Sequence, residues 1–295
     1  MRKTITFLLV LAGLMLSRTP TRARSGAGHM VIAAEAYRQL SPKLKTRVTE
    51  ILKSHPDYGK AAESFAGDNP ALDPDLFVFM RASTWADEIR RHGSPYDHPQ
   101  WHYIDYPLKP PAFPVEPGPE PTNDVLFGIA QCEKAIADRK ASPEDRAAYL
   151  ALLIHFVGMH QPLHCCSLVT ETYPTGDRGG NEFYVKPASR GISLHSLWDG
   201  LLGTSSGRVG SHLNYAIHIE AEHPRKSLPE LKKAKTPKAW SLESRALAVE
   251  KAYLNGELKG GASRETAVDL PEGYTKAAKA VADRQAALAR LPAGC

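Results

Sequence analysis

The chain has 295 residues and a formal net charge of +5, a length that allows one large domain or two small ones. The basic excess is small, and a nucleic-acid-binding surface requires a basic patch rather than a modest global charge. No segment after the first 23 residues approaches the length of a membrane-spanning helix, which argues against an integral membrane protein.

Residues 1–23 have the pattern of an export signal. Arg2 and Lys3 form a basic start, residues 5–16 supply an apolar stretch too short to span a membrane, and Ala23 closes a small-x-small cleavage site. A second candidate site closes at Ser25. Cleavage after Ala23 removes four basic residues, lowers the net charge from +5 to +1 and leaves residues 24–295. We expect this product to be exported, periplasmic or secreted, without a membrane anchor.

Helix signals dominate the rest of the chain. An apolar stripe predicts a helix over 29–40, and Ser41-Pro42 begins another that runs to about residue 54. Ser142-Pro143, followed by two acidic residues, is the clearest helix start and predicts a helix that runs to a histidine cluster. Later helices are expected over 208–221, 241–254 and 274–291.

Strand signals are sparse, and only residues 181–186 alternate as a strand does. The stretch 107–121 contains seven prolines and should form an extended surface loop. No internal repeat or change of composition divides the chain. The sequence therefore predicts an all-α fold, a single mainly helical domain with a short β-hairpin.

The most informative residues are histidines and aspartates. His155, His160 and His164 close the helix that begins at Ser142-Pro143, and Pro162 lets His164 turn away from the helix axis. Further along, His195 and Asp199 stand four residues apart, which places both on one helix face. Nitrogen and oxygen donors without thiolates suit a catalytic zinc site better than a structural one.

These motifs, in this order, resemble the S1/P1 nuclease family, whose members are exported, zinc-dependent, single-strand nucleases related to bacterial zinc phospholipase C. The resemblance covers nearly all of residues 24–295. It rests on these sequence elements: Gly28-His29, Trp85-Ala-Asp87, His102-Tyr-Ile-Asp105, His155, His160-Gln-Pro-Leu-His164, Gly179-Gly-Asn181, His195-x-x-Trp-Asp199 and the C-terminal helix from Tyr274. It implies a fold of the phospholipase C/nuclease type that holds up to three zinc ions.

The resemblance also implies a role for each matching residue. One zinc would be bound by Asp87, His102 and His155, and a second by His164, His195 and Asp199. A third would be bound by His29 with the amine and carbonyl of Arg24, the first residue after cleavage. Asp87 would act in catalysis. Independently of the resemblance, Arg90 lies about one helical turn after Asp87 and is expected to act in catalysis by binding a phosphate. Tyr103 would stack on a nucleobase and Asp105 would hydrogen-bond it, a contact that tolerates many sequences.

The chain departs from the family pattern where the family has an aspartate that bridges two zinc ions. Here Gly158 and Met159 occupy a segment that is one residue shorter, and no acid lies between Asp145 and Glu171. Removing one residue rotates everything after it by about 100° on an α-helix. We therefore expect a bulge or local unwinding after His155, and either a weakly held or absent third zinc or a bridging water or hydroxide in place of the carboxylate. Reduced or lost catalysis is one outcome of this departure.

Three functions fit these residues. The first is an endonuclease that cleaves single-stranded DNA or RNA, with 3'-nucleotidase activity as an extension, acting as a monomer. The second is a catalytically impaired relative that binds zinc or nucleotides. The third is a zinc phospholipase C, which would require a glutamate at the position of Asp199.

Two expectations concern the remaining cysteines and histidines. In an oxidising compartment, Cys165 or Cys166 is expected to form a disulfide with Cys132 or Cys295, since neighbouring cysteines rarely pair with each other. His160 is expected to pack beside the metal site rather than bind it. The histidines outside the motifs are expected at the surface: His55, His92, His98, His212, His218 and His223.

Overall fold

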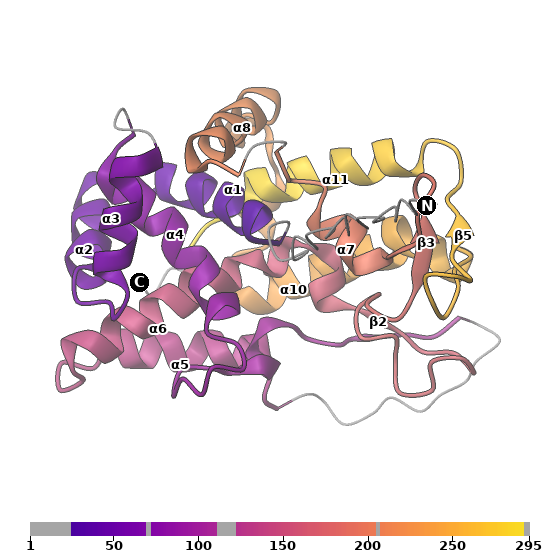
Figure 1. Cartoon of the computed structure of the whole chain (residues 1–295), viewed down its shortest axis with the longest axis horizontal. Coiled ribbons are helices and arrows are strands. Elements are labelled where there is room, and N and C mark those ends of the chain that lie inside the picture. The colour runs from indigo at the N-terminus through magenta and orange to yellow at the C-terminus, as the bar shows by residue number, and fades with distance from the viewer. Residues whose placement is uncertain (1–24, 69–71, 111–121, 205–206, 292–295) are drawn as a thin grey trace, which may run out of the picture.

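The computed structural model describes residues 25–68, 72–110, 122–204 and 207–291, and the proposed signal peptide and Arg24 lie outside these residues. Over the described residues the chain is mainly helical, as predicted (Figure 1). The α-helices are α1 (Ser25–Arg38), α2 (Pro42–Leu52), α3 (Tyr58–Asp68), α4 (Pro74–Glu88), α5 (Val125–Ala137), α6 (Pro143–Phe156), α7 (Leu194–Asp199), α8 (Val209–Glu222), α9 (Glu230–Lys233), α10 (Pro237–Leu247) and α11 (Tyr274–Leu288).

Helix α6 lies at the centre of the packing. Its start is as predicted, with the Ser142 hydroxyl accepting a hydrogen bond from the backbone N–H of Asp145 at 3.0 Å and Pro143 in the first turn. The helix is buried along most of its length from Ala147 onward, and α4 and α5 pack against it. Helix α1 packs against α4 on one side and against α8 on another (Figure 1). This arrangement brings the ends of α1, α4 and α6 together.

The predicted helix over 241–254 differs from the structure. Helix α10 begins earlier, because Thr236 caps it by accepting a hydrogen bond from Ala239 N–H at 3.2 Å and Pro237 occupies its first turn. It ends at Leu247 and continues as the π-helical turn η6 (Ala248–Ala252). The chain then turns through Asn255, a residue type that tolerates its left-handed φ of 60°.

The strands are short. Strand β3 (Tyr184–Lys186) pairs with β4 (Ile192–Ser193) as the expected antiparallel hairpin and also runs parallel to β5 (Val268–Asp269). The start of the proline-rich stretch forms β1 (Pro107–Leu108), which pairs in parallel with β2 (Ser167–Leu168) instead of lying free as a loop. Residues 111–121 of that stretch lie outside the described residues.

The structure corrects two expectations, one about a cysteine pairing and one about a histidine. Cys132, Cys165 and Cys166 are buried and form no disulfide with one another, so the expected pairing with Cys132 is wrong. The alternative partner, Cys295, lies outside the described residues. His212 is buried on α8, with its Nδ1 atom 3.1 Å from the Thr204 hydroxyl, rather than at the surface. Where the chain is described, none of the helices has the length and apolar character needed to cross a membrane.

Candidate metal centre

Seven imidazole or carboxylate groups from the sequence motifs lie close to one another. They come from separate elements, and the packing of α1, α4 and α6 brings those elements to one place. The residues are His29 on α1, Asp87 near the end of α4, His102 in the 3₁₀ turn η2 (Pro99–His102), His155 at the end of α6, His164 in the 3₁₀ turn η4 (Pro162–Cys165), and His195 and Asp199 on α7.

The first group is built around Asp87. Its Oδ2 atom lies 3.9 Å from His29 Nε2, and its Oδ1 atom lies 3.5 Å from His102 Nδ1. His155 Nε2 lies 2.9 Å from His102 Nδ1. Two nitrogens that bind one tetrahedral zinc at 2.0–2.1 Å lie about 3.3 Å apart, so this pair has nearly the spacing of two ligands of one ion. One donor atom each from His29, Asp87 and His155 lie within 4.8 Å of one another.

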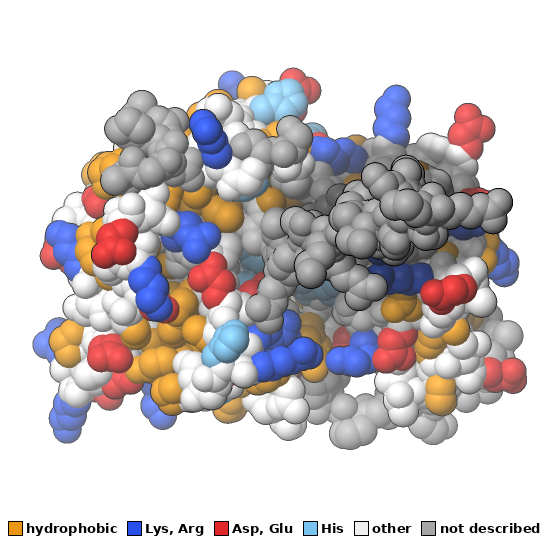
Figure 2. Space-filling model, viewed as in Figure 1, with side chains coloured by type: hydrophobic (Ala, Val, Ile, Leu, Met, Phe, Trp, Pro, Cys, Tyr) orange, Lys and Arg blue, Asp and Glu red, His pale blue; other side chains and the backbone are white. Residues whose placement is uncertain are grey.

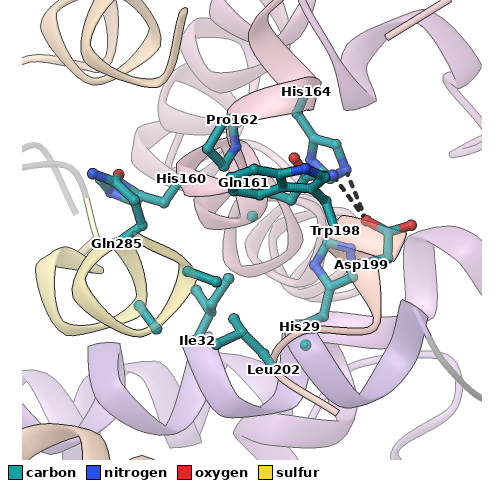
Figure 3. Close-up of a pocket in the computed structure, with 14 residues that line it drawn as sticks. His29, Ile32, His160, Gln161, Pro162, His164, Trp198, Asp199, Leu202 and Gln285 are labelled. Carbon is teal, nitrogen blue, oxygen red and sulfur yellow. Dashed lines mark hydrogen bonds and ion pairs between the residues drawn. The ribbon is translucent and has the colours of Figure 1, made fainter. Parts of the chain in front are cut away.

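The second group is built around Asp199. Its two oxygens face His164 Nε2 at 3.7 Å and His195 Nε2 at 3.5 Å, and the three donor atoms lie within 4.8 Å of one another. Gln161 donates a hydrogen bond from Nε2 to Asp199 Oδ1 at 3.0 Å. Figure 3 shows His164 and Asp199 facing each other, with His29 nearby at the edge of the same pocket.

Backbone carbonyls fix the orientation of two of these histidine rings. His155 Nδ1 lies 2.7 Å from Ser83 O, and His195 Nδ1 lies 2.8 Å from Gly179 O. Because a carbonyl can only accept a hydrogen bond, each Nδ1 carries the proton, which leaves the lone pair on Nε2. In both residues Nε2 therefore points into the centre as an available metal ligand.

His29 joins the two groups. Its ring stacks on His155 with centroids 4.0 Å apart and lies 6.2 Å from the ring of His164. Gly158 permits this position, because a Cβ atom at that residue would lie 2.5 Å from His29 Cε1. A side chain at residue 158 would therefore push His29 out of place.

The segment after His155 is locally altered, as expected, but it is tightened rather than unwound. Helix α6 ends at Phe156 and continues as the 3₁₀ turn η3 (Val157–His160). The side chain of Met159 is buried in the core, with 1% of its surface exposed. No carboxylate from this segment enters the centre.

Burial favours the neutral form of three of these histidines, which is the form that binds metal. It lowers the pKa of His29 to about 3 and also lowers the pKa of His155 and His102. Neighbouring histidines add to the lowering, whereas the Asp87 carboxylate opposes it at His29 and His155. Burial alone would raise the pKa of Asp199, but His195 and His164 beside it hold that pKa well below its usual range. The donor set therefore fits a zinc centre in its chemistry and its spacing.

Comparison with known proteins agrees with this geometry. The sequence model of the family described as S1/P1 Nuclease matches residues 25–292. The chain belongs to the S1/P1 nuclease family. Nuclease P1 of Penicillium citrinum and nuclease PA3 of a Penicillium species are each 27% identical to it over 176 residues, which cover 58% of this chain and 55% of either nuclease. This S1/P1 family member thus spans about half the length of the curated relatives it matches.

The residues expected to contact substrate lie at the edge of the centre. Tyr103 is 37% exposed and follows His102 directly. Burial raises the pKa of Asp105 to about 6, and the nearby Asp177 carboxylate adds to the rise. Arg90 Nη1 lies 3.5 Å from Asp87 Oδ1, and 40% of the Arg90 side chain is exposed. Around the middle of the face in Figure 2, basic side chains lie next to histidines.

Sequence reasoning missed the groups that support the expected ligands. Gln161 stands between two motif histidines, and its amide contact with Asp199 was not anticipated. The carbonyls of Ser83 and Gly179 have no signature in the residue type, although Gly179 belongs to a motif glycine pair. His160 is buried beside Trp240 and lines the pocket of Figure 3, which agrees with a packing role.

Proposed function

We propose that this chain is an exported, zinc-dependent phosphodiesterase that hydrolyses single-stranded DNA or RNA, with 3'-nucleotidase activity as an extension. The observation that carries the proposal is the pair of donor groups around Asp87 and Asp199, joined by the ring of His29. The names of the two Penicillium relatives as nucleases support the reaction class.

Each donor group is assigned to one zinc ion. Asp87, His102 and His155 would bind the first ion, and His164, His195 and Asp199 the second. His29 would bind a third ion with the amine and carbonyl of Arg24. Zinc bound here would acidify a water molecule and neutralise charge on the phosphoryl oxygens.

The protein groups around the ions would position the substrate. Arg90 is exposed enough to bind a phosphate while remaining next to Asp87, which holds its guanidinium near the centre. Tyr103 offers an exposed ring on which an unpaired base could stack, a contact that contributes about 1–3 kcal/mol per base. A base inside a duplex is already stacked, so this contact favours single strands.

A catalytically impaired, zinc-binding relative is the second candidate. The observation that favours it is the 3₁₀ turn η3, where Met159 is buried in the core and the segment from Val157 to His160 contains no acidic residue. A zinc phospholipase C is less well supported, because Asp199 stands where that enzyme class would have a glutamate.

The test combines metal analysis with hydrolysis assays on the purified chain. We expect bound zinc, cleavage of single-stranded DNA, little cleavage of the same sequence as a duplex, and no hydrolysis of phosphatidylcholine vesicles. Asp199→Ala should lower the rate on single-stranded DNA by more than about 100-fold, the upper end of the loss caused by removing an outer-shell partner. Zinc binding without cleavage of either nucleic acid would favour the impaired relative, and lipid hydrolysis would favour the phospholipase.

A further inference from the structure

The glycine-rich loop of residues 176–180 has several backbone φ angles in the left-handed region. Gly176, Arg178, Gly179 and Gly180 all have positive φ angles, between 56° and 94°. A Cβ atom at Gly179 would lie 2.5 Å from Leu163 O, next to His164, and one at Gly176 would lie 2.4 Å from Ser167 Oγ. The loop therefore packs by its backbone against the segment that carries His164.

Asp177 holds this loop in place. The residue is fully buried, and its Oδ1 atom accepts hydrogen bonds from Leu168 N–H at 2.9 Å and from the Ser167 hydroxyl at 3.3 Å. The Tyr253 hydroxyl donates to the same carboxylate, 2.8 Å from Oδ2 and 3.0 Å from Oδ1. A carboxylate can accept all of these donors at once, whereas an amide would turn an N–H toward one of them.

The same loop contacts His195 at two points. Gly179 O accepts the hydrogen bond from His195 Nδ1 at 2.8 Å, and Gly180 O accepts one from the backbone N–H of His195 at 3.1 Å. These two contacts determine the position of the residue and the direction of its ring. They leave His195 Nε2 facing Asp199 Oδ2 at 3.5 Å.

We propose that Asp177 is a positioning residue for the zinc centre, acting through the carbonyl of Gly179 on the ring of His195. This inference rests on the proposed zinc function of His195. Tyr253, from the turn after α10, also holds the Asp177 carboxylate in position through its hydroxyl group. Metal-binding histidines are oriented by the partner of their second nitrogen, and loss of that partner typically weakens metal binding 10–100-fold.

The test measures zinc affinity by competition with a chelator, so that it does not depend on nuclease activity. Asp177→Asn should weaken the most affected zinc site at least 10-fold, and the milder Tyr253→Phe should weaken the same site by a smaller factor. Tyr215→Phe is the matched control, because it also removes a tyrosine hydroxyl that donates to a carboxylate, that of Asp283, between α8 and α11. It should change zinc affinity less than twofold.

A double-mutant cycle separates positioning from general destabilisation. If Asp177 acts through His195, Asp177→Asn should have less than a twofold further effect on zinc affinity in a His195→Ala background. Equal losses in both backgrounds, or equal losses for Tyr253→Phe and Tyr215→Phe, would overturn the proposal. If Asp177→Asn does not fold, the Tyr253→Phe cycle with His195→Ala decides the question.

The outcome is independent of the nuclease assignment. Coupling between Asp177 and His195 in zinc binding, with no cleavage of nucleic acid, would leave this inference standing while the proposed nuclease function fails. If His195→Ala leaves zinc affinity unchanged, both the ligand role of His195 and the positioning role of Asp177 are wrong.

Discussion

A buried carboxyl group on α1 gives the sharpest prediction about stability. Glu35 is fully buried, and neither of its carboxylate oxygens has a hydrogen-bond partner among the described residues. Burial, with a smaller contribution from the Glu220 carboxylate, raises the pKa of Glu35 from 4.5 to about 7, against the opposing effect of Arg38 and Arg225. The folded protein therefore holds a proton on Glu35 that the unfolded chain has already released at neutral pH.

Because the pKa of Glu35 is higher in the folded than in the unfolded state, the stability of the protein should decrease as pH rises. Between pH 4.5 and about 7 the folded state binds more protons at this group than the unfolded state, so the free energy of unfolding falls as pH rises through that window. One pKa unit corresponds to about 1.4 kcal/mol, so the full loss at pH 8 is about 3 kcal/mol. Glu35→Gln keeps the shape of the side chain and removes the ionisation.

The assay is urea unfolding followed by circular dichroism at pH 5 and pH 8, with the same metal content for every variant. Glu35→Gln should be close to the parent at pH 5 and more stable by up to about 3 kcal/mol at pH 8. Glu50→Gln is the control, because Glu50 is exposed on α2 and forms only a surface pair with Lys53. A stability difference between Glu35→Gln and the parent that is the same at both pH values would refute the reasoning.

Three further predictions concern the metal centre. Asp199→Ala should remove one zinc ion while leaving the helical circular dichroism signal nearly unchanged, because Asp199 lies at the end of a six-residue helix; unchanged zinc content would remove it from the proposed ligands. Gly158→Ala should displace His29, 2.5 Å from the added Cβ, and lower zinc content measured by atomic absorption, whereas Gly59→Ala, at an open position, should not. The purified chain should bind fewer than three zinc ions tightly. Inserting an aspartate between Gly158 and Met159 should raise both the zinc content and the activity. If the parent already binds three ions tightly and the insertion changes nothing, a compensating ligand must be present.

The sequence predicted the parts of the fold that depend on local chemistry. The cap at Ser142-Pro143, the helix it begins and the hairpin after residue 180 depend on residues close to one another in the chain, and all three are present. The family pattern was also recognisable, because it consists of residue types in a fixed order. These signals depend on residue types and on neighbours in the chain, so a single sequence is enough to recognise them.

Contacts made by the backbone or by tertiary packing left no such signal. The carbonyl of Ser83 orients His155 across 72 positions of the chain, and any residue type could supply it. The burial of His212 depends on the tertiary packing of α8, which contacts both α1 and α11 and which the neighbours of His212 in the sequence do not encode. The expected disulfide with Cys132 required a distance between segments that the sequence does not contain.

The 3₁₀ turn after His155 has the geometry that the expected loss of one residue would require if His164 is still to lie beside Asp199. A 3₁₀ turn advances about 120° and 2.0 Å per residue, against about 100° and 1.5 Å in an α-helix. Over the four residues of η3 (Val157–His160) this gains about 80° and 2 Å, which nearly replaces the roughly 100° and 1.5 Å of one missing helical residue. The tightened turn would therefore restore the direction of the chain, but it supplies no carboxylate. The proposed centre keeps the donors on both sides of the turn, and the segment between them adds no negative charge.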